Sequence, residues 1–107
     1  MRANNDFELL EEFATGRSES AFRALVERHL PLVSGTARRV TRNPALAEEI
    51  AQTVFVLLAR KAKELPRHAV LSGWLFRTTR FVSARAIRGE PSNIDLAPFS
   101  FERFEKH

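Results

Sequence analysis

Apolar side chains recur every three or four residues through most of the chain, which is the spacing that places them on one face of an α-helix. The first such stretch covers residues 6–16, where Asn5 is placed to cap the helix and Gly16 to end it. A second stretch begins near Ser18 or Ser20 and runs to about residue 42. These patterns predict one short helix followed by one long helix.

Proline marks two points in the middle of the chain. Pro31 should kink or briefly interrupt the second helix, because proline has no amide hydrogen to donate to the preceding turn. Asn43 followed by Pro44 is a strong start signal, an N-cap with proline at the first helical position. A third helix should therefore begin there and run to about Glu64.

Residues 65–73 have the composition of a loop, and a fourth helical pattern follows them. Ser72 is placed to cap this helix, which should start at Gly73 or Trp74 and end near Arg88. The prediction is an all-α fold, a compact bundle of about four helices within residues 1–89. Residues 90–107 are expected to be a linker remnant or a C-terminal tail, with three phenylalanines that could dock on the bundle.

Composition narrows the class of protein. The chain has no cysteine, no apolar leader and no apolar run near the ~20 residues that span a bilayer, so we expect a soluble cytoplasmic protein. His29, His68 and His107 are too far apart in sequence to form a local metal motif, and no glycine-rich phosphate loop occurs. We therefore expect no metal, no cofactor and no catalytic residues, and a protein that is not an enzyme.

The net charge of +4 is concentrated in one part of the chain. Residues 54–89 carry eight Lys/Arg and one acidic residue, whereas residues 1–53 carry seven Lys/Arg and eight Asp/Glu. A local basic surface is typical of nucleic-acid binding or of contact with a membrane surface. The membrane interpretation is weaker, because the apolar residues are needed for the core.

The fourth helix divides into two faces when its residues are placed about 100° apart. The predicted core face comprises Leu75, Phe76, Thr79, Val82, Ala86 and Ile87. The opposite arc carries Arg77, Arg80, Arg85 and Arg88, with Trp74 and Phe81 among them. Arginines that pair with phosphates beside rings that stack on bases suit an unpaired strand. The plain alternative is an amphipathic helix whose basic face is solvated and whose two aromatic rings turn sideways into the core.

The third helix has a continuous core stripe and an outward face. The stripe comprises Ala47, Ile50, Ala51, Val54, Leu57, Leu58 and Ala62, followed by Leu65. The outward face comprises Glu49, Gln52, Val56, Arg60 and Lys63. An apolar Val56 on this polar face is typical of an anchor for a partner helix, although single exposed apolar residues are also common on protein surfaces.

Two strings give the chain a family resemblance. AEEIAQTVFVLLARKA at residues 47–62 and WLFRTTRFVSARAIR at residues 74–88 resemble the second conserved region of bacterial RNA polymerase sigma factors of the extracytoplasmic-function group. The upstream residues are similar to the leading helices of the same domain, including the Ala21-Phe22 pair. The resemblance covers about residues 6–88.

The resemblance implies two binding surfaces. In the family, the third helix docks on the clamp helices of the polymerase largest subunit, so we expect polymerase contacts at Glu49, Gln52, Val56 and Arg60. The loop over residues 65–73 corresponds to the element that captures a flipped base of the non-template strand, and the fourth helix lies along that strand. The expected contacts with the −10 promoter element are His68, Trp74, Arg77, Arg80, Phe81, Arg85 and Arg88.

Departures from the family pattern support an alternative. Family members commonly have Asn at the position of Phe81 and Asp at that of Arg85, and Thr53 replaces a usual Glu. The family's usual second domain, a helix-turn-helix, does not follow Gly89, so a truncated chain or a single-domain relative is expected. The alternative function is an interaction module that binds polymerase or an anti-sigma factor without opening promoters.

Overall fold

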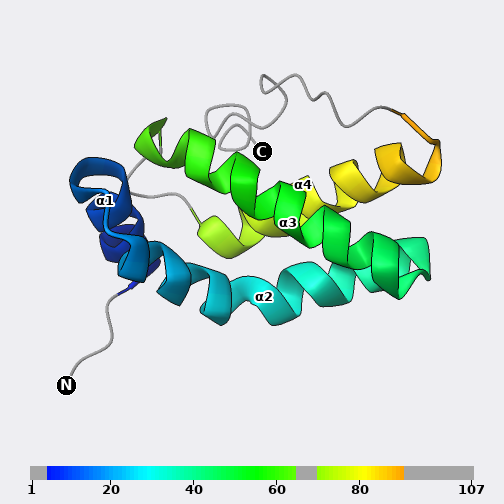
Figure 1. Cartoon of the computed structure of the whole chain (residues 1–107), viewed down its shortest axis with the longest axis horizontal. Coiled ribbons are helices and arrows are strands. Elements are labelled where there is room, and N and C mark those ends of the chain that lie inside the picture. Colours follow the sequence, from blue (N-terminus) through cyan, green and yellow to red (C-terminus); the bar gives the residue numbers. More distant parts are fainter. Residues whose placement is uncertain (1–4, 65–69, 91–107) are drawn as a thin grey trace.

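The computed structural model describes residues 5–64 and 70–90, and these residues form a bundle of helices (Figure 1). The elements are α1 (Asp6–Gly16), α2 (Glu19–Thr41), α3 (Pro44–Lys61), the short 3₁₀ helix η1 (Ala62–Glu64) and α4 (Leu71–Ile87). No strand occurs within the described ranges. The predicted all-α bundle of about four helices is confirmed.

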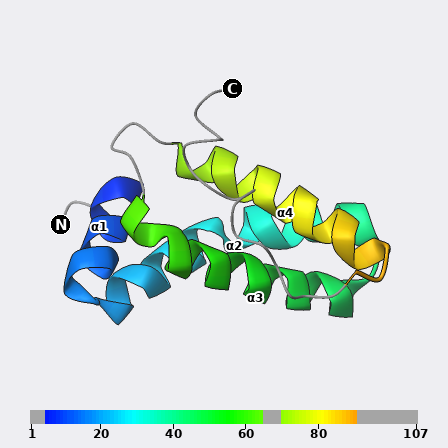
Figure 2. The same cartoon turned by 90° about the horizontal axis from the view of Figure 1, so that it is seen from above.

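The three long helices pack against one another, and α1 packs against α2 and η1 at one end of the bundle. α2 and α4 run in the same direction while α3 runs in the opposite direction (Figures 1 and 2). Consequently, the C-terminal ends of α2 and α4 and the N-terminal end of α3 meet at the end of the bundle that lies away from α1.

Side-chain caps begin the first three helices. The Asn5 side chain accepts a hydrogen bond from the amide of Glu8, and the Glu8 carboxylate accepts one from the amide of Asn5, which completes a capping box. Asn43 accepts from the amide of Leu46, as the Asn-Pro start signal predicts. The first helix ends at Gly16 as expected, but the left-handed residue that follows is Arg17, with φ 55°.

The expected interruption at Pro31 does not occur, because α2 continues without a break from Glu19 to Thr41. Pro31 and Glu27, whose carbonyl loses its helical donor at this point, are both exposed. Water can therefore satisfy that carbonyl, and the helix tolerates the proline.

The predicted start of the fourth helix was also wrong. α4 begins at Leu71, after Val70, and no side chain caps it, so Ser72 lies within the first turn. Leu71, Trp74 and Leu75 are 3%, 1% and 0% exposed. Burying these three residues on one face extends the helix back into the segment with loop-like composition, because apolar burial outweighs a missing cap of about 1 kcal/mol.

The core contains the whole described part of the stripe predicted for α3, with Leu65 outside the described residues. Phe55 is buried as well, although the predicted stripe did not include it. Leu10, Leu25, Leu58 and Leu75 are fully buried, so every long helix contributes to one common core.

Candidate functional site

Most of the basic residues that were predicted to lie on the outer face of α4 are exposed to solvent. Arg77, Arg80, Phe81 and Arg88 are exposed, and Arg85 is half-buried. Phe81 has 42% of its surface exposed, so its ring is accessible from solvent. The arginines and one of the two predicted rings therefore share one surface.

Trp74 does not belong to this surface. It is 1% exposed and is the largest fully buried side chain in the described residues, so the prediction of an exposed stacking ring at this position was wrong. Trp74 lies at the edge of the basic arc on a helical wheel, where a large ring can turn either way. Burial of its large apolar area turns it inward, as the plain alternative proposed.

Phe76, rather than Trp74, is the second exposed ring of α4. It was expected in the core, yet it is 37% exposed, and the Arg80 guanidinium carbon lies 5.7 Å from its ring centroid. The Arg85 guanidinium carbon lies 5.9 Å from the ring centroid of Phe81. These separations are typical of cation–π pairs. Ile87 was also assigned to the core and is 56% exposed.

We call Phe76, Arg77, Arg80, Phe81 and Arg85 the aromatic–arginine face. Two of its arginines are held beside rings one turn away on the same helix. Such pairing limits the rotamers of both side chains. The face therefore presents flat rings and positive charge, and its side chains lose little conformational entropy when a ligand binds.

Glu90 joins two arginines at the end of α4. Its carboxylate lies 3.2 Å from Nη1 of Arg85 and accepts a hydrogen bond of 2.6 Å from Nε of Arg88. The bond from Arg88 lowers the pKa of the Glu90 carboxyl, and the same bond raises the pKa of Arg88. Glu90 therefore stays charged at neutral pH and partly neutralises this end of the basic surface, a contact that was not predicted from the sequence.

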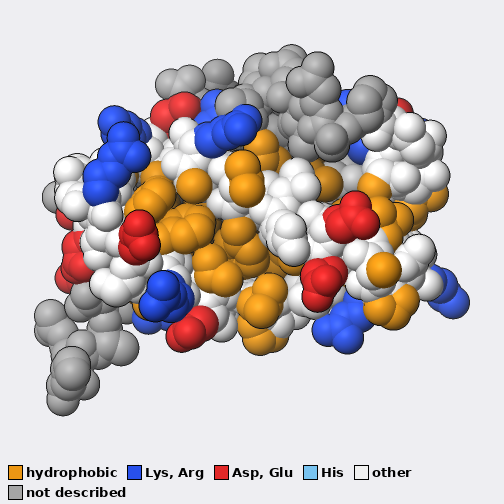
Figure 3. Space-filling model, viewed as in Figure 1, with side chains coloured by type: hydrophobic (Ala, Val, Ile, Leu, Met, Phe, Trp, Pro, Cys, Tyr) orange, Lys and Arg blue, Asp and Glu red, His pale blue; other side chains and the backbone are white. Residues whose placement is uncertain are grey.

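The second surface is a groove between α2 and α3. Its volume is about 480 Å³, and it is lined by Phe22, Val26, Leu30, Glu48, Ala51, Gln52, Phe55, Val56 and Ala59. Figure 3 shows hydrophobic side chains gathered over these two helices. Val56 is 49% exposed and Leu30 is 42% exposed, so the groove is an open apolar surface.

The outward face predicted for α3 forms one side of this groove. Gln52 and Val56 line it, and Glu49 and Arg60 are exposed on the same helix. The α2 side of the groove, formed by Phe22, Val26 and Leu30, was not predicted, because which side of α2 meets α3 depends on how the two helices pack. The groove also continues along the seam, where a second hollow of about 330 Å³ is lined by Leu30, Ser34, Arg38, Pro44, Glu48 and Ala51.

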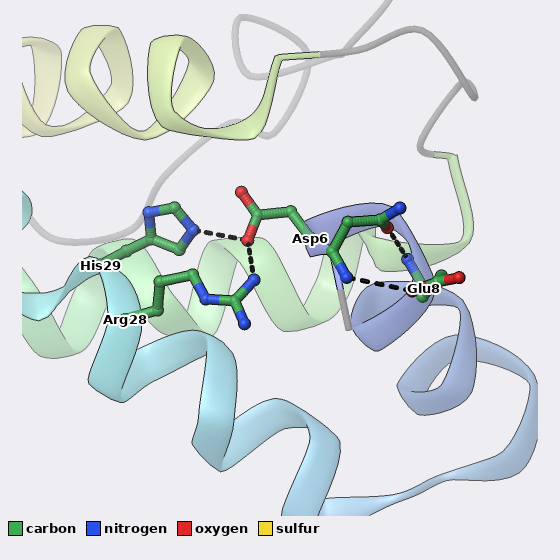
Figure 4. A network of polar contacts seen from close by, with 5 residues as sticks. Asp6, Glu8, Arg28 and His29 are labelled. Atoms are coloured by element: carbon green, nitrogen blue, oxygen red, sulfur yellow. Dashed lines mark hydrogen bonds and ion pairs between the residues drawn. The ribbon is translucent and has the colours of Figure 1, made fainter. Parts of the chain in front are cut away.

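A polar contact joins α1 to α2 (Figure 4). One oxygen of Asp6 lies 2.9 Å from Nη1 of Arg28 and 2.9 Å from Nε2 of His29. His29 is 7% exposed, so its role is structural. His68 and most of the predicted base-capturing loop lie outside the described residues.

No group of three His, Cys, Asp or Glu side chains is placed to hold a metal ion within residues 5–64 and 70–90. None of the helices in these ranges is both long enough and apolar enough to cross a membrane.

Comparison with known proteins identifies the family of the chain. Residues 25–91 match the family model for sigma-70 region 2. Over 79 residues the chain is 32% identical to the RNA polymerase sigma factor CarQ of Myxococcus xanthus, an alignment that covers 74% of this chain and 45% of that relative. The chain therefore spans less than half the length of this curated relative, and no solved structure matches it significantly. Because the family match covers well over half of the chain, including all of α3 and α4, the chain belongs to the sigma-70 region 2 family of sigma factors.

Proposed function

We propose that this domain docks on core RNA polymerase through the α2–α3 groove and binds the −10 promoter element as an unpaired strand through α4. The observation that carries the DNA assignment is the pair of exposed rings, Phe76 and Phe81, each within 6 Å of an arginine. The domain acts by binding in the cytoplasm and performs no chemistry.

The aromatic–arginine face suits an unpaired strand better than a closed duplex. Guanidinium groups pair with backbone phosphates, and aromatic rings stack on bases only where the bases are unstacked. Phe76 and Phe81 lie five positions apart, so the two rings point about 140° apart around the helix and face different parts of the strand. A strand that follows α4 would meet Arg77 and Arg80 between them.

The groove suits a helical partner. Leu30 and Val56 flank an apolar floor, and Gln52 and Glu48 provide hydrogen-bonding groups among its lining residues. An amphipathic helix that places apolar side chains in such a groove buries them between two packed helices. The clamp helices of the polymerase largest subunit are the proposed partner, with Glu49 and Arg60 in reach on the exposed surface of α3.

A second candidate function rests on Glu90. Because its carboxylate already pairs with Arg85 and Arg88, part of the basic surface is occupied within the chain itself. In this alternative the groove binds polymerase or an anti-sigma factor, while the domain does not open promoters.

Fluorescence anisotropy with single-stranded and duplex oligonucleotides of the same −10 sequence tests the DNA assignment. We expect a preference for the single strand, and we expect Phe76→Ala and Phe81→Ala to weaken binding, each by roughly tenfold, as loss of one stacked base implies. Phe22→Ala, which changes a groove residue, is the matched control. Equal and negligible binding to both oligonucleotides would favour the interaction module.

Co-purification with core polymerase tests the docking surface. Leu30→Asp and Val56→Asp should each abolish capture, because either one places a charge in the apolar groove. Ile87→Asp introduces the same charge at an exposed apolar position on α4 and should leave capture unchanged. Capture that survives both groove variants would show that this surface was assigned incorrectly.

A further inference from the structure

We propose that residues 95–104 of the C-terminal tail bind back into the α2–α3 groove, with Phe99 and Phe101 as the anchors, so that the chain carries its own competitor for this surface. The contact itself does not depend on the proposed function, and only its effect on polymerase binding rests on that function. The tail, whose phenylalanines could dock on the bundle according to the sequence, lies outside the described residues.

The groove exposes apolar surface that no described segment covers. Leu30 on α2 has 42% of its surface exposed and Val56 on α3 has 49%, and both line the hollow of about 480 Å³. Large apolar side chains placed in this hollow remove surface from water on both helices as well as on themselves. The groove therefore accepts a segment rich in aromatic or aliphatic residues.

The tail has the composition that such a groove accepts. Residues 94–104 contain one isoleucine, one leucine and three phenylalanines. Segments that stay fully solvated are typically poor in such side chains. In an extended chain alternate residues point to the same side, so Phe99 and Phe101 would enter the groove together. Ser100 and Glu102 would then face water.

The tail also starts at the end of the bundle where the groove begins. The C-terminal end of α4 meets the end of α2 and the start of α3 (Figures 1 and 2). The second hollow of the groove lies at the same end, because Arg38 and Pro44 line it. Packed helices lie about 8–10 Å apart, and the nine residues from Pro91 to Phe99 span up to about 30 Å when extended. Phe99 can therefore reach the apolar hollow.

The order of polar and apolar residues along the tail matches the order along the groove. The hollow nearest the start of the tail has a mixed lining that includes Ser34, Arg38 and Glu48. Arg38 donates to the hydroxyl of Ser34 at 3.1 Å, and no carboxylate within residues 5–64 and 70–90 forms an ion pair with it. Asp95 supplies such a carboxylate just before the phenylalanines. Asp95 beside Arg38 would lead Phe99 into the mainly apolar hollow that follows.

Paired cysteines can report this contact directly, because the chain has none of its own. Gln52→Cys with Ser100→Cys places one thiol at the exposed edge of the groove and one between the two anchors, in the full chain. Under mild oxidation with glutathione disulfide, we expect an intramolecular disulfide to form about tenfold faster than in the control pair Ile87→Cys/Ser100→Cys. Ile87 is exposed on α4 and far closer to Ser100 in sequence, so random motion of the tail favours the control.

Removing the anchors tests their part in the contact. Phe99→Ser/Phe101→Ser, added to the pair at Gln52, should slow disulfide formation about tenfold. Without the cysteines, the same variant should bind core polymerase about tenfold more tightly if the tail covers the groove in about nine molecules of ten, because apparent affinity scales with the open fraction. Ser100→Ala/Glu102→Ala changes the positions expected to face water and should bind polymerase like the parent.

The outcomes distinguish this proposal from the proposed function. Disulfide formation at Gln52 that is no faster than at Ile87, or that survives loss of both phenylalanines, would overturn the tail contact whatever the polymerase result. A disulfide-linked dimer would also overturn it and would assign the groove to a second copy of the chain. Selective intramolecular trapping with unchanged polymerase binding would support the tail contact and contradict the assignment of the groove to polymerase. Circular dichroism confirms that each variant is folded.

Discussion

The α2–α3 groove and the outer face of α4 lie on the same small bundle, but they use different physical forces. The groove is lined mainly by apolar side chains from two helices, among them Leu30 and Val56, so binding there depends on removing apolar surface from water. The α4 face comes from one helix and depends on arginines and rings. Under the proposed function the domain would bind a protein and a nucleic acid at once, because the two surfaces draw on different residues.

The two surfaces also differ in how they are supported. The groove needs α2 and α3 held together, and the described part of α3 uses its other face for the common core. The α4 face needs only that α4 is anchored, which Leu75 achieves from the opposite side and Trp74 from the edge of the face. The comparison predicts that damage to the core affects both surfaces, whereas changes on either surface affect only that surface.

The largest expected effect is at Trp74. Trp74→Ala should reduce the free energy of unfolding by about 3–5 kcal/mol, because it leaves a large cavity in the core. Phe81→Ala, which truncates an exposed ring on the same helix, should cost less than about 1 kcal/mol. Urea denaturation measures both. If the Trp74→Ala variant were stable but had lost DNA binding, Trp74 would have to be assigned to the DNA-binding surface instead of the core.

The next largest effect is expected from salt, which should weaken binding at the two surfaces to different extents. If four arginines on α4 neutralise four phosphates, raising the salt concentration from about 50 to 200 mM should weaken single-strand binding about 50-fold. Polymerase binding through the apolar groove should change only about threefold or less over the same range, since few exposed charges contribute. Titrations of one protein preparation against both partners test this. Similar salt slopes for the two partners would contradict the distinction drawn here.

A moderate effect is expected at the contact between α1 and α2. Asp6→Ala removes the acceptor beside the buried His29, and an unsatisfied buried polar group costs about 1–2 kcal/mol of stability. DNA affinity should not change, because the contact lies at the α1 end of the bundle. Chemical denaturation and anisotropy provide the two readouts, and reduced DNA binding in the folded variant would show that α1 supports α4.

The smallest expected effect is at Glu90. Glu90→Gln should increase affinity for DNA roughly two- to fivefold, because a half-buried carboxylate no longer competes with phosphates for Arg85 and Arg88. Glu19→Gln, at an exposed position near the start of α2, gives the same change in net charge as a control. Weaker binding by Glu90→Gln would instead assign Glu90 to positioning the two arginines.

Much of the fold could be predicted because its signals are local. Capping by Asn5 and Asn43 and the periodic stripe on α3 depend on residues within one or two turns of each other. The same local signals identified the outward position of Val56 and the arginines of α4. The start of α4 could not be predicted in this way, because burial of Leu71 against the other helices outweighed the absence of a cap.

The sequence alone thus determined the number of helices, their order and the residues that share each face, since helical geometry fixes the angle between successive side chains. Only the tertiary structure decided what happens at the edges of those faces. Trp74 turned inward and Phe76 outward because neighbouring helices cover one flank of α4 and leave the other open. Packing of α2 against α3 also formed the groove, because its lining combines residues of both helices and no single helix carries it.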